Sequence, residues 1–183
     1  MKKIGIVTDS HSSISQEEAK KLGIFVLPMP FYIDGECYYE SVTLSRELFF
    51  EKLTSGADIS TSQPSPTAVM EIWDKALEEY EKILYMPISS GLSSSYNTAM
   101  MLAQEEKYEG RVLVVDDGQV AAPLHQMILD TLDMIEKGYE AEQIRDLLER
   151  AGDRMMIYIA LQTLECLKKG GRVTPAAAAL GSV

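Results

Sequence analysis

The stretch that most constrains the fold is a short apolar run that leads into a serine-rich turn, at residues 82–96 (KILYMPISSGLSSSY). The run from Ile83 to Ile88 is almost continuously apolar, which is typical of a strand buried on both faces of a parallel sheet. It passes directly into the turn from Ser89 to Ser95, and a helical pattern follows. This strand and its turn are therefore predicted to lie at the centre of an α/β fold.

The turn after this strand is suited to bind an anion. The first N–H groups of a helix have no intrahelical partner, the helix dipole favours negative charge, and Gly91 lets the backbone approach closely. No Lys or Arg lies between Lys82 and Lys107, and neither a Walker pattern nor G-x-G-x-x-G occurs there. Uncharged donors fit one carboxylate better than a polyphosphate, which usually recruits a cation. The alternative is an ordinary strand–helix turn capped by serine.

The rest of the chain alternates strand-like runs with helical patterns. Strands are predicted at 4–8, 24–27, 111–115 and 155–161, and a hairpin at 31–39 around Asp34-Gly35. Helices are predicted at 15–22, 43–53, 66–80, 94–106, 121–137, 141–151 and 163–169. Residues 59–66 are predicted to be an irregular linker because Pro64 and Pro66 oppose a helix. The alternation predicts an α/β fold, a mostly parallel sheet with helices on both faces.

Composition excludes several classes of partner. A length of 183 residues suits one domain with a sizeable core, and a net charge of −11 disfavours nucleic acid, which binds basic faces. Cys37 and Cys166 are far apart and show no metal-like spacing, as expected for reduced thiols of a cytoplasmic protein. The start of the sequence does not match a signal peptide, and no apolar run approaches the length of a membrane span.

Polar residues follow several predicted strands at their carboxyl ends, where open α/β sheets bind ligands. These residues are Asp9 with Ser10, the serines at 89–95, and Asp116 with Asp117. If the loop at 60–65 folds over the serine turn, Thr61 and Ser93 would bind one carboxylate from two sides. The alternative for Thr61 is a turn residue that bonds its own backbone. The alternative for Asp9 is a carboxylate that shapes its own turn.

An acyl-ester hydrolase is the alternative function. Ser93, Asp116 or Asp117, and His125 follow one another in the chain order of an α/β-hydrolase triad. However, the pattern G-x-S-x-G is not met, because Ser95 stands where the second glycine is expected. His125 also lies in a predicted helix, close in sequence to the proposed acid. A metal-dependent phosphatase would need clustered carboxylates, and the first strand ends without a D-x-D motif, so no metal site is predicted.

Four stretches together resemble the DegV family. They are TDS at 8–10, TSQPS at 61–65, ISSGLSSSY at 88–96 and LKKGGRVTPAAAALGS at 167–182. The similarity runs along the whole chain, in the same order and with similar spacing. The resemblance implies a two-domain α/β protein that buries one long-chain fatty acid. It further implies a carrier, not itself an enzyme, that presents the acyl carboxylate to a separate subunit of a bacterial fatty acid kinase.

The resemblance also implies roles for particular residues. Thr61 and Ser93 would hydrogen-bond the carboxylate, and the N–H groups of Ser62 and Ser94 would assist. Arg172 would lie near the pocket mouth and face the partner or the acyl phosphate. The chain departs from the family at Ser94, where glycine is usual, and this is expected to restrict backbone approach. Supporting residues that do not touch the ligand would be Asp9, Ser10, Ser90 and Gly91.

Chains of the family continue beyond the point that corresponds to Val183. The expected division is an N-terminal α/β domain at residues 1–160 and the start of a truncated C-terminal domain at residues 161–183. Part of the acyl tunnel would then be absent from this chain. The predicted partners are a long-chain fatty acid, the kinase subunit and, transiently, a membrane, with no cofactor and no nucleic acid.

Overall fold

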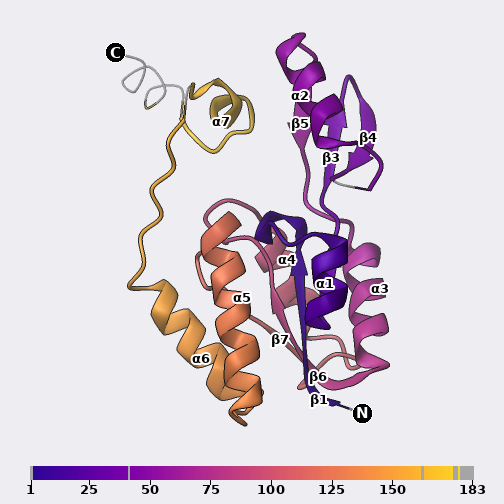
Figure 1. Ribbon diagram of the computed structural model, residues 1–183, viewed down its shortest axis with the longest axis vertical. Coiled ribbons are helices and arrows are strands. Elements are labelled where there is room, and N and C mark those ends of the chain that lie inside the picture. Colours follow the sequence, from indigo (N-terminus) through magenta and orange to yellow (C-terminus); the bar gives the residue numbers. More distant parts are fainter. Residues whose placement is uncertain (1, 41, 162, 175–176, 178–183) are drawn as a thin grey trace. The chain divides into compact units, whose positions relative to one another are not determined.

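The computed structural model describes residues 2–40, 42–161, 163–174 and 177 (Figure 1). The chain divides into two compact units, which are described separately below. The first unit comprises Met1–Met29 and Gln63–Met156, and the second comprises Pro30–Ser62 and Ile157–Val183. The predicted division into an N-terminal domain at residues 1–160 and the start of a second domain at residues 161–183 stays a prediction.

The first unit is built on a parallel sheet of four strands in the order β2-β1-β6-β7. The strands are β1 (Lys2–Asp9), β2 (Phe25–Leu27), β6 (Tyr80–Met86) and β7 (Val112–Val114). All three pairings are parallel, with Thr8 opposite Met86 and Tyr85 opposite Val114. The carboxyl ends of the strands therefore lie along one edge of the sheet, as the alternation of the sequence predicted.

Helices cover both faces of this sheet (Figure 1). They are α1 (Gln16–Leu22), α3 (Pro66–Leu77), α4 (Ser95–Leu102), α5 (Ala121–Glu136) and α6 (Ala141–Gly152), with a 3₁₀ turn η1 (Ser10–Ser12) after β1. On one face, Leu84 packs with the apolar sides of α5 and α6. On the other, Tyr85 packs with α3, and the Trp73 ring lies edge-on to it at 5.3 Å. Alternate strand residues thus build two cores, and both sheet faces are buried.

Local signals in the sequence explain where these elements begin. The Ser15 and Ser65 hydroxyls accept the N–H groups of Glu18 (3.1 Å) and Ala68 (3.2 Å), which caps α1 and α3 as predicted. Gly5 lies under the ring of Tyr80, and a Cβ at this position would stand 2.6 Å from that ring. Close packing at the start of the sheet therefore requires glycine at position 5.

The second unit contains a small antiparallel sheet in the order β4-β3-β5. Its strands are β3 (Pro30–Ile33), β4 (Glu36–Tyr39) and β5 (Ile59–Thr61), and its helices are α2 (Arg46–Thr54) and α7 (Glu165–Lys169). The predicted hairpin is confirmed, since Asp34 and Gly35 both have positive φ (51° and 86°), as a tight hairpin turn requires. The prediction of an irregular linker was wrong at residues 59–61, because this segment pairs with β3.

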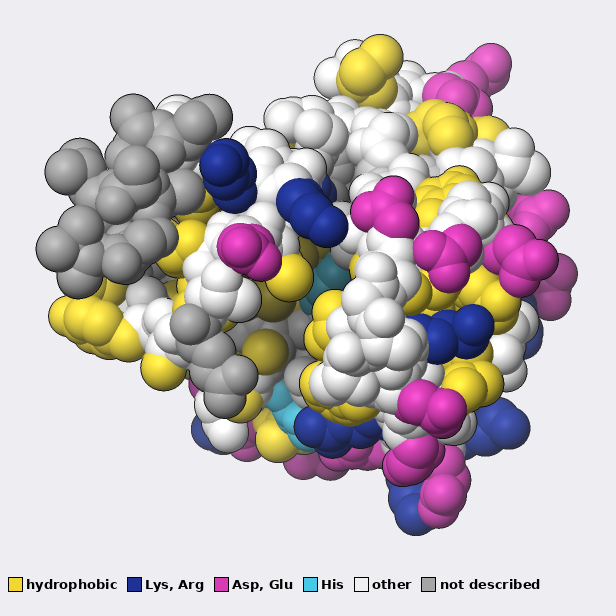
Figure 2. Space-filling view, turned by 90° about the horizontal axis from the view of Figure 1, so that it is seen from above, with side chains coloured by type: hydrophobic (Ala, Val, Ile, Leu, Met, Phe, Trp, Pro, Cys, Tyr) yellow, Lys and Arg dark blue, Asp and Glu magenta, His cyan; other side chains and the backbone are white. Residues whose placement is uncertain are grey.

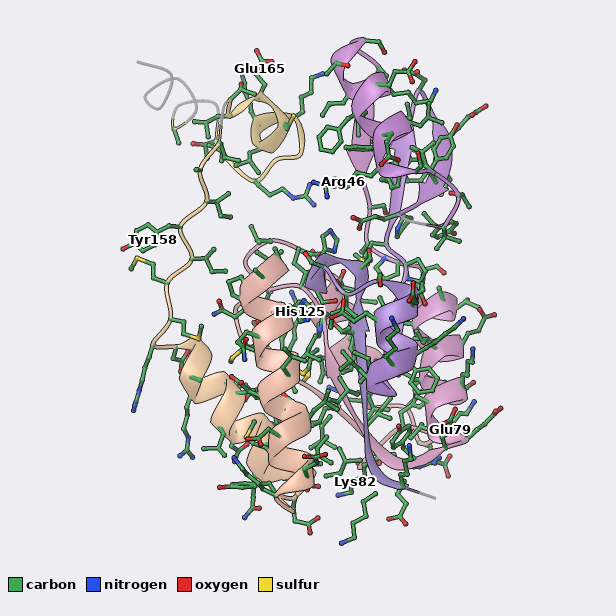
Figure 3. All side chains as sticks on the ribbon, in the orientation of Figure 1. Arg46, Glu79, Lys82, His125, Tyr158 and Glu165 are labelled. Atoms are coloured by element: carbon green, nitrogen blue, oxygen red, sulfur yellow. The ribbon has the colours of Figure 1, made fainter. Side chains whose placement is uncertain are left out.

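The prediction of a strand at residues 155–161 was also wrong. The described segment forms no strand, and its apolar side chains are exposed, with Tyr158 88% accessible. Figure 3 shows Tyr158 projecting from an extended stretch of chain after α6. Apolar alternation suits a strand only where a neighbouring strand supplies hydrogen bonds, and no described residue does so here. The predicted helix at 163–169 is confirmed as α7, while most of the tail from residue 175 lies outside the described residues.

Among the described residues, the helices are too short or too polar to cross a membrane.

Candidate functional site

The serine loop, which we define as residues 88–95 between β6 and α4, is fixed by hydrogen bonds to the ends of the two neighbouring strands. The Ile88 N–H donates to Asp9 Oδ2 (2.9 Å), at the end of β1. The Ser89 N–H donates to the Gln119 carbonyl (3.0 Å) and the Ser90 N–H to Asp116 Oδ1 (3.3 Å), both after β7. Three successive N–H groups are thus held from both sides, and the predicted convergence of the strand ends is confirmed.

Asp9 connects two of these strand ends. Its side chain is completely buried, Oδ1 accepts the His11 N–H (2.9 Å), and the His11 Nδ1 atom lies 3.3 Å from the same oxygen. Its other oxygen accepts the Ile88 N–H, so Asp9 shapes its own turn and also supports the serine loop. The next residue, Ser10, accepts the Met29 N–H through its hydroxyl (3.1 Å).

Ser93 lies at the point where the serine loop enters α4. Its N–H donates to the Ser89 carbonyl (3.1 Å), as does that of Leu92 (3.0 Å). The half-buried Ser93 hydroxyl accepts the Ser95 N–H (3.2 Å) and lies 2.8 Å from the Ser95 hydroxyl oxygen. Within the loop, the Gly91 N–H donates to the Ser89 hydroxyl (3.2 Å). The Ser93 side chain is therefore positioned by its own turn.

Ser94 is the N-cap residue of α4. It has a φ of −73°, which any L-residue adopts, so serine in place of the usual glycine adds no backbone strain here. The first intrahelical hydrogen bond of α4 runs from the Thr98 N–H to the Ser94 carbonyl. The N–H groups of Tyr96 and Asn97, which come earlier in the helix, therefore have no intrahelical acceptor. The start of α4 therefore offers hydroxyl and N–H donors next to the positive end of a helix dipole.

Thr61 and Ser62 belong to the second unit. Thr61 ends β5 opposite Phe31, and the Ser62 N–H donates to the Pro30 carbonyl (3.4 Å), so this N–H already has an acceptor. Two positions after Thr61, Gln63 Oε1 accepts the hydroxyl of Thr98 on α4 (3.1 Å). The joint contact of Thr61 and Ser93 with one carboxylate stays a prediction.

Arg172, predicted to face a partner, lies two residues after the end of α7 in the second unit. Its guanidinium donates to the Gly170 carbonyl. In the same unit, Lys169 Nζ lies 4.0 Å from Asp58 Oδ1. On the face that Figure 2 shows, basic side chains are interspersed with acidic and uncharged ones, and the described residues there form no continuous basic surface. The role of Arg172 stays a prediction.

The structure brings no hydrolase triad together. His125 projects from α5 (Figure 3), and its Nε2 atom lies 3.1 Å from Glu18 Oε1. The hydroxyl partner of Ser93 is Ser95, and no imidazole among the described residues lies within hydrogen-bond reach of Ser93. Asp116 accepts the N–H groups of Ser90 and Gly118 and does not orient a histidine. The geometry that activates a serine nucleophile is therefore missing.

Sequence reasoning placed Asp117 among the polar residues at the strand ends and considered it as a triad acid, but it missed the part that this residue plays in supporting the serine loop. Its side chain is 1% exposed, and Oδ1 accepts the Gln119 N–H (2.9 Å). Burial, together with the nearby carboxylates of Asp116 and Asp9, raises the pKa of Asp117 to about 7, against the lowering effect of the Gln119 N–H. The available signal was a second acidic residue directly after a fully buried strand.

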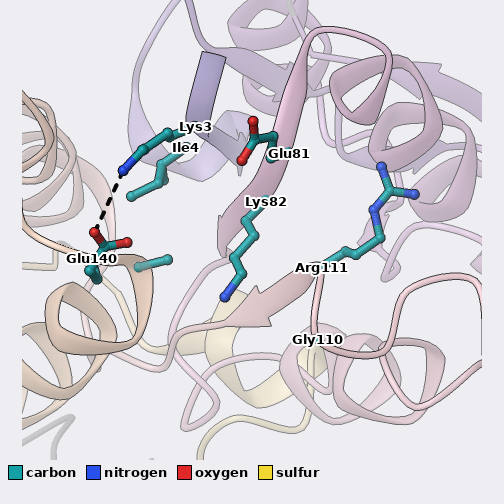
Figure 4. Close-up of a pocket in the computed structure, with 8 residues that line it drawn as sticks. Lys3, Ile4, Glu81, Lys82, Gly110, Arg111 and Glu140 are labelled. Atoms are coloured by element: carbon teal, nitrogen blue, oxygen red, sulfur yellow. Dashed lines mark ion pairs between the residues drawn. The ribbon is translucent and has the colours of Figure 1, made fainter. Parts of the chain in front are cut away.

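The first unit has two cavities that Ser93 does not line. One, of about 250 Å³, is lined by charged side chains that include Lys3, Lys82 and Arg111 (Figure 4). Lys3 pairs there with Glu140 at 3.8 Å. The other, of about 350 Å³, lies beside β7. Neither is an apolar tunnel, and among the described residues no group of three His, Cys, Asp or Glu side chains could hold a metal ion.

Comparison with known proteins identifies the relatives of this chain. The profile of the DegV family, described as an uncharacterised protein family, matches residues 3–183. A DegV domain-containing protein of Deinococcus radiodurans is 34% identical over 181 residues, which are 98% of this chain and 64% of that protein. One from Streptococcus pneumoniae is 33% identical over 184 residues, with 99% and 64% covered.

Solved structures show the same fold. A DegV family protein from Thermus thermophilus, described by its fatty acid binding, superposes with a TM-score of 0.86 at 34% identity, over 98% of this chain and 64% of that one. A stearic acid-binding protein from Eubacterium ventriosum gives a TM-score of 0.82 at 25% identity, with 100% and 64% covered. The chain thus spans about two thirds of the length of these relatives (64%).

Proposed function

Because the chain belongs to the DegV family, we propose that its serine loop binds the carboxylate of a long-chain fatty acid. The observation that carries the proposal is the set of uncharged donors where the serine loop enters α4, with Ser93 held in place beside the first turn. A carboxylate accepts several hydrogen bonds and is stabilised at a helix N-terminus. The two solved relatives, named for fatty acid binding and stearic acid binding, support the same ligand class.

The ligand contacts are proposed as follows. Ser93 donates its hydroxyl hydrogen to the carboxylate, assisted by the N–H of Ser94, and Thr61 and Ser62 contact it from the other side. Asp9, Gln119 and Asp116 hold the serine loop through three backbone bonds, so few degrees of freedom remain to be frozen when the ligand binds. Ser10, Ser90 and Gly91 belong to the same supporting turns.

The acyl tail would supply most of the affinity. Each buried CH₂ contributes about 0.8 kcal/mol, so a long chain contributes on the order of 10 kcal/mol before entropy costs, while the head group sets orientation. Because neither cavity of the first unit is an apolar tunnel, we propose that a C-terminal domain beginning near residue 161 encloses the tail in the longer protein. The exposed side chains of Met156 and Tyr158 (74% and 88% accessible) are suited to packing against such a domain.

In this proposal the protein is a carrier in the cytoplasm and not a catalyst. It would present the carboxylate to a separate kinase subunit for phosphorylation, with Arg172 near that partner or the acyl phosphate. Transient contact with a membrane would allow the lipid to be exchanged. The pairing of His125 with Glu18, and of Ser93 with Ser95, supports binding over hydrolysis.

Substitution of the two hydroxyl residues tests the proposal. In the full-length protein that contains this chain, Ser93→Ala and Thr61→Ala should each weaken fatty acid binding. Loss of one hydrogen bond to a charged group costs about 1.5–3 kcal/mol, which corresponds to roughly tenfold or more in Kd. The exposed Thr67 supplies a matched control, since Thr67→Ala should leave the Kd unchanged. Unaltered affinity in both test variants would remove Ser93 and Thr61 from the site.

Two further measurements address the ligand and the alternative function. Mass spectrometry of lipid extracted from the purified protein should identify a long-chain fatty acid. A fluorophosphonate probe should leave Ser93 unlabelled, because no base is found beside it among the described residues. Covalent labelling at Ser93 would favour an acyl-ester hydrolase instead.

A further inference from the structure

A continuous series of hydrogen bonds leads from the Asp117 side chain to Ser93. Asp117 Oδ1 accepts the Gln119 N–H at 2.9 Å, and the Gln119 carbonyl accepts the Ser89 N–H at 3.0 Å. The Ser89 carbonyl in turn accepts the Ser93 N–H at 3.1 Å. Gln119 is fixed further because its side-chain amide donates to the Asp117 carbonyl at 2.9 Å. The Asp117 carboxyl group is therefore connected to the serine loop through the backbone groups of Gln119 and Ser89.

The Asp117 carboxyl group has unsatisfied bonding capacity. Asp117 Oδ2 and Gln119 Oε1 are both buried, and neither finds a donor among the described residues. Their residues are only 1% and 2% exposed, so bulk water offers little compensation. In the ionised form, Oδ2 is a buried acceptor that receives no hydrogen bond from the described residues. Protonation of Oδ2 makes the carboxyl group neutral and turns this oxygen into a hydrogen-bond donor. Two buried acceptors in one turn therefore favour the protonated form, independently of any titration argument.

The charges around Asp117 act in the same direction. Asp116 is adjacent in the chain, and Asp9 faces it from the end of β1; both carboxylates disfavour a further negative charge. Beyond them, His11 contacts Asp9. Glu149 of α6 also interacts with Asp116, and its pKa is raised by burial. Together with burial, these carboxylates raise the pKa of Asp117 to about 7.

The backbone of α6 also closes in on Asp117. A Cβ at Gly152 would stand 2.2 Å from the Asp117 carbonyl oxygen, so the backbone of α6 packs tightly against this residue. The turn that carries Asp117 therefore has little freedom to move its carboxyl group toward water when the group ionises.

We propose that Asp117 is a positioning residue whose protonation makes the serine loop, and ligand binding to it, dependent on pH. The part that concerns the ligand rests on the function proposed above. A carboxylate bound at the serine loop adds another negative charge to this group of acids, so it favours protonated Asp117. By linkage, protonation of Asp117 strengthens carboxylate binding, and binding is accompanied by proton uptake.

The first experiment uses the chain without ligand. Amide resonances of Gln119, Ser89 and Ser93 are followed by ¹H–¹⁵N NMR between about pH 5.5 and 8.5, a range that contains the expected transition. In the wild type these three amides should shift with a common midpoint near neutrality, and in Asp117→Asn they should not. The exposed residue Asp130 provides the matched control. In Asp130→Asn the same three amide resonances should shift with pH as they do in the wild type.

The His11 imidazole resonances are recorded in the same samples, because histidine side chains in general change charge near neutral pH and would have to be distinguished from Asp117. Shifts of the three amides that persist in Asp117→Asn and follow His11 would overturn the assignment to Asp117. Amides that do not move at all in the wild type would overturn it as well.

The second experiment uses the full-length protein and measures binding of decanoate, a soluble fatty acid whose carboxyl group is ionised throughout this range. Binding is followed by calorimetry in two buffers of different ionisation enthalpy. The wild type should bind at least threefold more tightly near pH 6 than near pH 8 and take up protons on binding. Asp117→Asn should bind equally at both values and take up none. Equal affinity of the wild type at both pH values would refute the coupling. Absence of any decanoate binding, with the amide titration intact, would refute the proposed function and leave the pH-dependent loop standing.

Discussion

The contribution of Asp9 can be tested by replacing it with asparagine, which keeps the size of the side chain. The carboxylate is completely buried and accepts two backbone N–H groups at 2.9 Å, from His11 and Ile88. Asparagine has one acceptor oxygen and one NH₂ group. In the Asp9→Asn variant, therefore, one of the two N–H groups must face another donor in a site that water does not reach.

The expected loss can be estimated from these two contacts. A hydrogen bond to a charged group contributes about 1.5–3 kcal/mol, and an N–H left without an acceptor in the interior costs about 1–3 kcal/mol. Since these terms overlap, we expect the free energy of unfolding to fall by about 2–4 kcal/mol. For a chain of this size, 1 kcal/mol corresponds to a Tm change of about 2–4 °C, so the Tm should drop by roughly 4–16 °C.

The assay uses Trp73, which is the only tryptophan of the chain and is completely buried in the first unit. Its fluorescence in a urea titration reports the unfolding of the unit that contains Asp9. Asp130→Asn, at an exposed position of α5, should change the free energy of unfolding by less than about 0.5 kcal/mol. If the free energy of unfolding of Asp9→Asn also differs from the wild type by less than about 0.5 kcal/mol, the reasoning is refuted. Such a result would mean that the two N–H groups do not require a charged acceptor.

Two further predictions concern stability. Asp117 has a pKa of about 7 in the folded chain, against an ordinary value of 3.8 for an aspartate, so the folded state binds more protons between these values and stability falls as the pH rises through this window. At 1.36 kcal/mol per pKa unit the whole fall is about 4 kcal/mol, of which about 2.5–3 kcal/mol lies above pH 5. Urea titrations near pH 5 and pH 8 should show this smaller fall in the wild type and not in Asp117→Asn. Gly5→Ala places a Cβ 2.6 Å from the Tyr80 ring and should cost about 1–3 kcal/mol in thermal melts. Gly91→Ala, whose new Cβ would make only ordinary contacts, should melt close to the wild type, and equal melting of the two variants would contradict the packing argument.

Much of the fold could be predicted because its signals are local. Ser65 followed by Pro66 marks the start of α3, and the Asp34-Gly35 pair marks the hairpin, since each depends on the conformational preferences of a few adjacent residues. The two segments predicted wrongly, residues 59–61 and 155–161, fail for a common reason. Whether a short segment is a strand depends on whether another strand lies beside it, and its own sequence does not contain that information.

The candidate site shows the same distinction. Ser93 and the start of α4 could be found from the sequence, because a serine-rich turn between a buried strand and a helix has few structural alternatives. The state of Asp117 could not be found, because burial and the nearby carboxylates of Asp9 and Asp116 act on it together. The sequence shows that Asp116 and Asp117 follow a strand. Tertiary packing decides which of the two carboxyl groups is buried and which is reached by water.

The sequence by itself determined the alternation of strands and helices, the capped starts of α1 and α3, and the serine-rich turn with its uncharged donors. Only the tertiary structure decided what holds that turn in place. The bond from Ile88 to Asp9 joins residues 79 positions apart, and it exists because β1 lies beside β6 in the sheet. Strand order is fixed by burying both faces of the sheet at once, which is a property of the whole unit and of no single stretch of its sequence.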